Sequence, residues 1–185
     1  MSHEDEGWLE DGIREVLIRP EEIAARVQEL GRQISLDYAG RELVMIGVLK
    51  GVLFFMADLL RCVTVPVEVD FLAVSSYSHK NDRQGGVRLL KDLEISIEGR
   101  HVLFVEDMVD TGLTLNYLLR NLQARQPASL EVCAFLNKSK NRLMEIPLKY
   151  RGFDVPDRFV VGYGLDYREQ YRNLPFIGLL KGDRL

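Results

Sequence analysis

The sequence contains few of the residues that build disulfide scaffolds, zinc sites or membrane spans. Only two of its 185 residues are cysteines and three are histidines. Two cysteines cannot make a disulfide-rich framework, and the scattered histidines give neither a zinc-binding spacing nor a histidine-based nucleophilic triad. No apolar run reaches the ~18 residues that cross a bilayer. The net charge of −4 lacks the basic excess typical of nucleic-acid-binding proteins. We therefore expect neither a membrane nor a nucleic acid as partner.

The N-terminal segment lacks the basic and apolar regions of a signal peptide, because Met1 to Gly7 contains three acidic residues, no lysine or arginine and no apolar run. We expect a disordered tail over about residues 1–10 and a cytoplasmic protein. A hydrophobic content of 46% over 185 residues is typical of one globular domain, which we place at 1–185.

The most informative stretch runs from Val102 to Thr114. Its first four residues are apolar and predict a strand that is buried on both faces. Leu115, Leu118 and Leu122 follow at the spacing of one helix face. The polar residues between them therefore form the turn from the carboxyl end of a strand to a helix, where open α/β sheets bind their ligands.

This turn combines an anion site with an acidic pair. Thr111, Gly112 and Thr114 offer hydroxyl and N–H groups at a helix N-terminus, which suits a phosphate. Glu106 and Asp107 lie just upstream and suit sugar hydroxyls or a metal ion. A ribose 5-phosphate satisfies both halves. The alternative is a plain acidic turn that caps a helix, which we consider weaker because an acidic pair after an apolar strand has little structural use.

The rest of the chain alternates strands and helices, which predicts an α/β fold with a central parallel sheet. We predict helices that begin at Pro20 and span 52–60, and we expect 147–158 to be irregular. The polar segment from Ser78 to Gly86 cannot bury much apolar surface and should be mobile. The other predicted strands are 14–18, 43–49, 67–74, 87–90, 130–136, 159–163 and 176–179.

The stretch from Val102 to Thr114 resembles the 5-phosphoribosyl-1-pyrophosphate (PRPP) binding motif of the type I phosphoribosyltransferases. From about Ile18 to Lys181 the chain is similar to the hypoxanthine(-guanine) phosphoribosyltransferases of bacterial type. The resemblance implies a central parallel twisted sheet flanked by helices, with a small hood built from the chain ends. It also implies PRPP and a 6-oxopurine base as substrates, Mg²⁺ as cofactor, and a homodimer or homotetramer.

The resemblance assigns the sugar phosphate of PRPP to one continuous run of residues. Asp110 would also be catalytic, as the general base that faces N7 of the purine. Three carboxylates, those of Glu106, Asp107 and Asp166, would bind the metal. The run that would bind ribose and 5′-phosphate comprises Glu106, Asp107, Met108, Val109, Asp110, Thr111, Gly112, Leu113 and Thr114.

The remaining implied roles concern pyrophosphate, the base and a lid. Lys50, Gly51 and Arg172 would bind pyrophosphate, with a cis peptide bond between Leu49 and Lys50. Lys138 would read the 6-oxo group, Phe159 would stack on the base, and the backbone of Val160 would bond its edge. Ser76 and Tyr77 would begin a mobile lid over 76–86 that excludes water during transfer.

Each of these residues has a plainer interpretation when it is taken alone. A lysine at a strand end such as Lys50 or Lys138 commonly reaches solvent, and Phe159 alone would be assigned to the core. Two functional alternatives also stay open: an RNA-binding regulator on the same fold, and an enzyme that prefers xanthine. The match at Lys138, Phe159, Val160 and Asp166 argues against the regulator, whereas the preference among hypoxanthine, guanine and xanthine is undecided.

Overall fold

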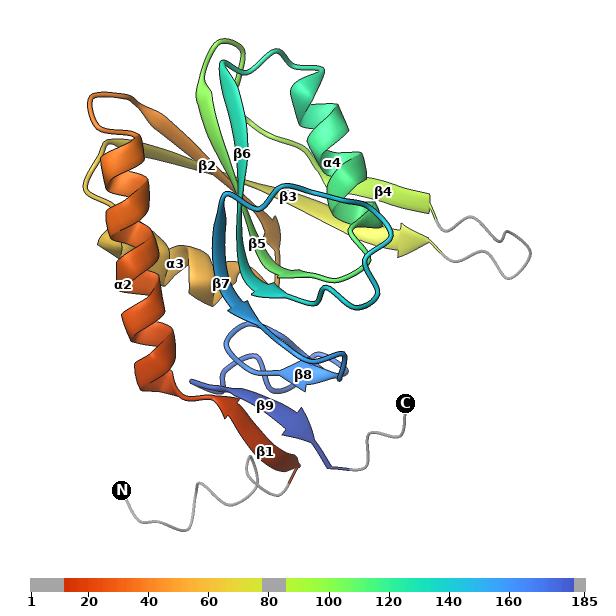
Figure 1. The fold of residues 1–185 in the computed structure, drawn as a ribbon. Coiled ribbons are helices and arrows are strands. Elements are labelled where there is room, and N and C mark those ends of the chain that lie inside the picture. Colours follow the sequence, from red (N-terminus) through yellow and green to blue (C-terminus); the bar gives the residue numbers. More distant parts are fainter. Residues whose placement is uncertain (1–11, 78–85, 182–185) are drawn as a thin grey trace.

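The structure is a computed structural model that describes residues 12–77 and 86–181. The predicted tail over 1–10 and the lid segment 78–85 lie outside the described residues. Figure 1 shows a central sheet with helices on both faces and a smaller sheet beyond it. The helices are α2 (Pro20–Asp37), α3 (Leu53–Cys62) and α4 (Leu113–Gln123). The strands are β1 (Ile13–Ile18), β2 (Leu43–Leu49), β3 (Val67–Tyr77), β4 (Gly86–Lys91), β5 (His101–Val109), β6 (Ser129–Asn137), β7 (Tyr150–Asp154), β8 (Val160–Val161) and β9 (Ile177–Leu180).

The central sheet has six strands in the order β4-β3-β2-β5-β6-β7. All neighbouring pairs are parallel except β3 and β4, which are antiparallel. On β5, Leu103 and Val105 pack into the core cluster that contains α2 and α3, whereas Val102 and Phe104 pack with α4. Both faces of β5 are therefore buried, as its apolar sequence predicts.

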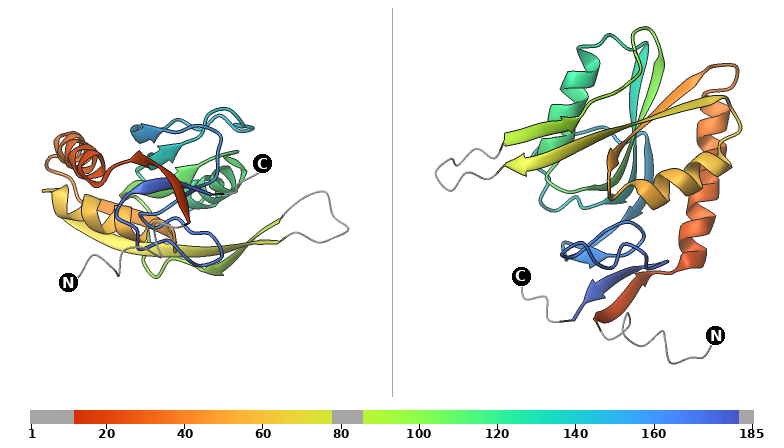
Figure 2. Two further views of the ribbon diagram at one scale, coloured as in Figure 1. Left: turned by 90° about the horizontal axis from the view of Figure 1, so that it is seen from below. Right: turned by 180° about the vertical axis from the view of Figure 1, so that it is seen from behind.

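The smaller sheet is the hood that the family resemblance implies. Its order is β1-β9-β8, and both pairs are antiparallel. The first and last described residues meet here, because the Lys181 N–H donates to the Gly12 carbonyl at 2.8 Å. Figures 1 and 2 show this sheet beyond the end of the central sheet toward which β7 points. Within the described ranges, no helix is long and apolar enough to cross a membrane.

Two local predictions are wrong. β5 continues through Glu106 and Asp107 to Val109, so the acidic pair lies on the strand and the turn begins after it. The segment expected to be irregular contains β7, which pairs in parallel with β6. β7 was missed because it is only five residues long and because Gly152 and Asp154 are residue types depleted in strands. Gly152 allows β7 to approach β6 closely, since a Cβ at this position would lie 2.2 Å from the Phe135 carbonyl oxygen.

A buried carboxylate on β3 fixes the segment that follows β4. Asp70 is 6% exposed, and its carboxylate accepts bonds from the N–H groups of Glu94 (2.6 Å) and Ile95 (3.3 Å) and from Lys91 Nζ (3.2 Å). Burial raises the pKa of this carboxyl, but the hydrogen bonds outweigh burial and leave the pKa below its ordinary value. The Asp70 carboxylate is therefore ionised in the folded protein, and its hydrogen bonds stabilise the native state.

We expect Asp70→Asn to lower the free energy of unfolding at pH 7 by about 1.5–3 kcal/mol, the usual worth of a hydrogen bond to a charged group. Because the folded-state pKa is lowered, the stabilisation is present above the unfolded pKa of ~3.9 and disappears as pH falls through the folded-state value. The difference in free energy of unfolding between wild type and variant should therefore disappear at acidic pH. Urea denaturation at pH 7 and at lower pH measures it. Asp92→Asn, on the exposed side of the same segment, is the control and should cost under ~1 kcal/mol; a gap that does not vary with pH would contradict the assignment.

Candidate active site

The turn between β5 and α4 encloses a cavity of about 220 Å³. Gly112 immediately precedes α4 and has φ of +81°, a left-handed conformation that favours glycine. Its carbonyl accepts the N–H of Asn116 at 2.8 Å, which starts the helix. The cavity is lined by Glu106, Met108, Val109, Asp110, Thr111, Gly112, Thr114 and Leu115. The structure thus gathers seven of the nine residues assigned to the sugar phosphate around one hollow at a helix N-terminus.

Two carboxylate oxygens at this cavity are buried without hydrogen-bond partners in the described part of the chain, Glu106 Oε2 and Asp110 Oδ1. Buried acceptors without partners cost free energy, so a native structure keeps them for a reason. A ligand that offers hydroxyl or N–H donors would satisfy both.

Glu106 and Asp107 point to different surroundings because successive side chains alternate along a strand. Glu106 lines the cavity, whereas the Asp107 carboxylate lies against Gly51, where an added Cβ would come within 1.6 Å of Oδ2. A side chain at position 51 would therefore displace the Asp107 carboxylate. Burial, reinforced by the charge of Asp107, raises the pKa of Glu106 well above its ordinary value. Burial likewise raises the pKa of Asp107 to about 6, although the Met108 N–H and the Arg172 charge act in the opposite direction.

The residues assigned to pyrophosphate come together beside Asp107. The peptide bond between Leu49 and Lys50 is cis, as the resemblance implies. Gly51 packs against the loop between β8 and β9, since a Cβ on Gly164 would lie 2.0 Å from the Gly51 carbonyl oxygen. From that loop, Arg172 Nη1 donates to the Gly164 carbonyl at 2.8 Å. Arg172 Nη2 pairs with Asp166 Oδ1 at 2.7 Å. Two cationic side chains and two carboxylates therefore share one end of the sheet.

The residues assigned to the base lie on separate elements. Lys138 follows β6 and is only 6% exposed. Its backbone N–H donates to the Val109 carbonyl at 2.9 Å, which places Lys138 beside the start of the turn 110–114, the phosphate turn. Val160 is buried on β8. Phe159 is 38% exposed, with its ring edge-to-face against Tyr167 at 5.6 Å. Phe159 is thus available to a ligand, and the joint role of the three residues toward a base stays a prediction.

The predicted lid begins on a strand. The backbone of β3 runs to Tyr77, three residues beyond the predicted end of the strand, and pairs Ser76 with Val87 and Tyr77 with Gly86. The role of Ser76 and Tyr77 in a lid stays a prediction.

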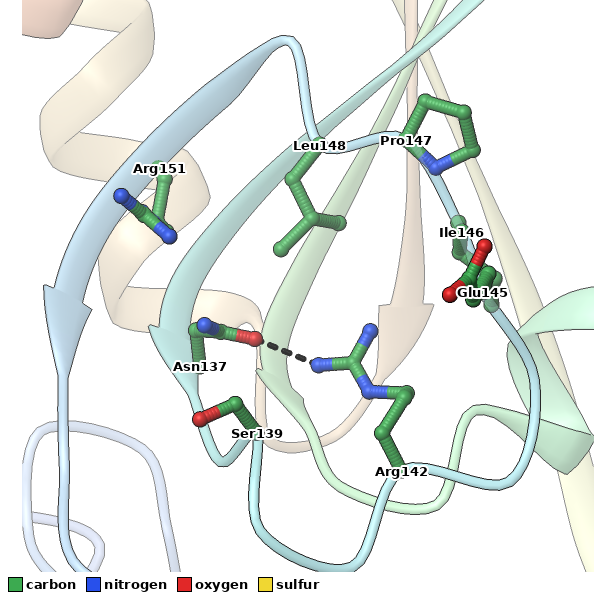
Figure 3. Close-up of a pocket in the computed structure, with 8 residues that line it drawn as sticks. All are labelled: Asn137, Ser139, Arg142, Glu145, Ile146, Pro147, Leu148 and Arg151. Atoms are coloured by element: carbon green, nitrogen blue, oxygen red, sulfur yellow. Dashed lines mark hydrogen bonds between the residues drawn. The ribbon is translucent and has the colours of Figure 1, made fainter.

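Sequence reasoning did not single out Arg142. Its Nη2 donates to the Val109 carbonyl at 3.2 Å and to Asn137 Oδ1, so it ties the end of β5 to the end of β6. The following N–H groups, of Leu143 and Met144, donate to the Thr111 carbonyl at 3.0 and 3.2 Å. Figure 3 shows Arg142 directed toward Asn137 at the edge of a second cavity, of about 590 Å³. An arginine in a polar loop gives no local signal for such a contact.

The carboxylates fit magnesium only as part of a ligand complex. Across residues 12–77 and 86–181, no group of three or more histidine, cysteine, aspartate or glutamate side chains could hold a metal ion by itself. Magnesium usually keeps several waters and takes one or two protein carboxylates together with phosphates of a substrate. Asp107 and Asp166 both interact with Arg172 and suit such an ion. The buried oxygen of Glu106, which has no partner among the described residues, suits either an ion or a hydroxyl.

The mostly parallel sheet, the hood from the chain ends and the acidic strand end before a phosphate-type turn define the class of type I phosphoribosyltransferases. The comparison with known families agrees. The chain belongs to the phosphoribosyl transferase domain family, whose model matches residues 17–168.

Individual relatives share most of their length with this chain. It is 50% identical over 174 residues to a hypoxanthine-guanine phosphoribosyltransferase of Mycobacterium avium, covering 91% of this chain and 86% of the relative. It is 46% identical over 173 residues to the Bacillus subtilis protein of the same name, covering 94% and 96%. Among solved structures it is similar to a hypoxanthine phosphoribosyltransferase from Staphylococcus aureus, with a TM-score of 0.90, 45% identity and 95% of both chains covered.

Proposed function

We propose that the protein transfers the 5-phosphoribosyl group from PRPP to hypoxanthine or guanine, giving IMP or GMP and pyrophosphate in purine salvage. The observation that carries the proposal is the pair of buried oxygens of Glu106 and Asp110 around the turn at Gly112, to which no residue of 12–77 or 86–181 donates a hydrogen bond. Relatives named for this activity at 46–50% identity support the same choice.

The reaction forms a bond between carbon 1 of the ribose and N9 of the purine and breaks the bond from carbon 1 to pyrophosphate. The electron pair of the broken bond leaves with pyrophosphate, and the N7 proton passes to Asp110. Lys50 and Arg172 stabilise the negative charge that develops on the leaving group. Holding both substrates in line supplies much of the remaining acceleration.

The other side of the sugar is held by the phosphate turn. N–H and hydroxyl groups of Thr111, Gly112 and Thr114 bind the 5′-phosphate at the positive end of α4. Glu106 and Asp107 accept the ribose hydroxyls or, with Asp166, hold magnesium. When bound, magnesium adds positive charge at the pyrophosphate. A cytoplasmic location and a homodimer or homotetramer belong to the same proposal.

The test is an assay of the purified protein with PRPP, magnesium and one base at a time: hypoxanthine, guanine, xanthine or adenine. We expect IMP and GMP to form with one pyrophosphate per nucleotide and the reaction to stop when EDTA removes magnesium. A rate with xanthine above both other 6-oxopurines would replace the proposed specificity. No nucleotide from any base would contradict the proposal.

A further inference from the structure

We propose that Glu169 is an internal counter-ion of the pyrophosphate subsite, which gives up its cations when pyrophosphate binds and takes them back when it leaves. The inference rests on the proposed function, because that function assigns Lys50 and Arg172 to pyrophosphate. None of the roles that the family resemblance implies falls on Glu169.

A single oxygen of the Glu169 carboxylate contacts both cations. Glu169 Oε2 lies 2.9 Å from Lys50 Nζ and 3.4 Å from Arg172 Nη2, so it bridges the two cations. The cations come from distant parts of the chain: Lys50 follows β2, and Arg172 lies between β8 and β9. The side chains of Lys50 and Glu169 are 67% and 66% exposed, so a dissolved anion can reach the bridge directly.

The backbone holds the carboxylate in this position. Arg168 and Glu169 have φ of 54° and 64°, left-handed conformations that are uncommon outside glycine. The Glu169 N–H donates to Asp166 Oδ2 at 2.9 Å, and Tyr167 and Gln170 exchange two backbone bonds of 3.1 Å across the turn. Strained residues persist where surrounding contacts hold them, and such places are often functional.

Pyrophosphate and the Glu169 carboxylate compete for the same two cations, Lys50 and Arg172. Phosphate oxygens would take the same N–H donors that the carboxylate occupies, and two anions in one place repel each other. Lys50 lowers the pKa of Glu169, so the competitor is ionised at neutral pH. Exposed ion pairs are individually weak, which lets the exchange proceed easily in both directions.

The exchange of partners at Arg172 also changes the contacts of Asp166. Both of its oxygens are engaged, Oδ1 with Arg172 Nη2 and Oδ2 with the Glu169 N–H. When Arg172 turns to pyrophosphate, Oδ1 loses its partner and becomes available as a ligand oxygen. The cation sites and the assigned metal carboxylate therefore change partners together.

The test compares wild type with Glu169→Gln, which keeps the size of the side chain and removes its charge. The probe is magnesium pyrophosphate, titrated by calorimetry and used as product inhibitor in the transferase assay. We expect the dissociation constant and the inhibition constant to fall by about 3–10-fold, the combined worth of one exposed and one partly buried ion pair. Glu98→Gln is the control, because Glu98 is exposed at the opposite, amino end of β5, and it should leave both constants unchanged.

A second pair of variants separates competition for Lys50 from general repulsion. In a Lys50→Met background the gain from Glu169→Gln should shrink, because the carboxylate no longer competes for that cation. A gain of the same size there would overturn the bridging role. Equal pyrophosphate affinity for wild type and Glu169→Gln would overturn the inference while the proposed function stood. A wild type that neither binds pyrophosphate nor makes nucleotide would overturn the proposed function instead.

Discussion

Replacing Asp110 by asparagine is expected to lower kcat by roughly 10²–10⁴-fold, the usual contribution of a general base, while PRPP affinity stays near that of wild type. Asp110 lines the cavity before α4, and its Oδ1 is buried without a partner within the described residues. Asparagine keeps the shape and the acceptor oxygen but cannot take a proton. Steady-state kcat and the PRPP dissociation constant from calorimetry measure the two halves of the prediction.

The outcome distinguishes two roles for Asp110, proton transfer and ribose binding. A low kcat with normal PRPP affinity supports proton transfer. A kcat close to wild type excludes the general-base role, and a loss of PRPP affinity assigns the side chain to holding the ribose. Asp92→Asn, an isosteric change on the surface near Arg125, is the control and should alter neither quantity.

The second large effect concerns base choice at Lys138. Lysine offers only hydrogen-bond donors, a 6-oxopurine presents an acceptor at position 6, and adenine presents an amino group there. Because Lys138 is only 6% exposed, facing donors would be left unpaired, a mismatch that commonly costs a factor of ~10⁴ or more in kcat/KM. Lys138→Gln can turn a carbonyl toward the amino group. It should cut kcat/KM for hypoxanthine and guanine sharply and narrow the gap to adenine.

The experiment measures kcat/KM for the three bases in both proteins. The backbone bond from Lys138 to the Val109 carbonyl does not involve the side chain, so the substitution should keep the strand end in place. Lys140→Gln, two residues on and exposed, is the matched control. A ratio of hypoxanthine to adenine that is the same in Lys138→Gln and wild type would show that Lys138 does not read position 6.

Local patterns in the sequence predict the parts of the fold that depend on local burial. The apolar run from Leu43 to Leu49 matches β2 at both ends, and the helix predicted to begin at Pro20 begins there as α2. β7 escaped prediction because its stability comes from pairing with β6 and from the close approach at Gly152.

The site also has one part that local sequence predicts and one part that it does not. The phosphate turn is contiguous in sequence, so its residue types and spacing predict it directly. The bridge from Glu169 to Lys50 joins residues 119 positions apart, and the contact of Arg142 with Val109 spans 33. Side-chain contacts over such separations follow from the topology of the sheets, which single residues do not encode.

The pairing of β1 with β9 sets an order of events during synthesis of the protein. β1 leaves the ribosome before the other described strands, yet its partner is Ile177–Leu180. The six strands of the central sheet can be made and can pair before β9 exists, whereas β1 must wait with unpaired backbone groups. The loop that carries Asp166 and Arg172 is anchored only when β9 arrives. A nascent chain can therefore complete its phosphate turn first, and its pyrophosphate half becomes competent last.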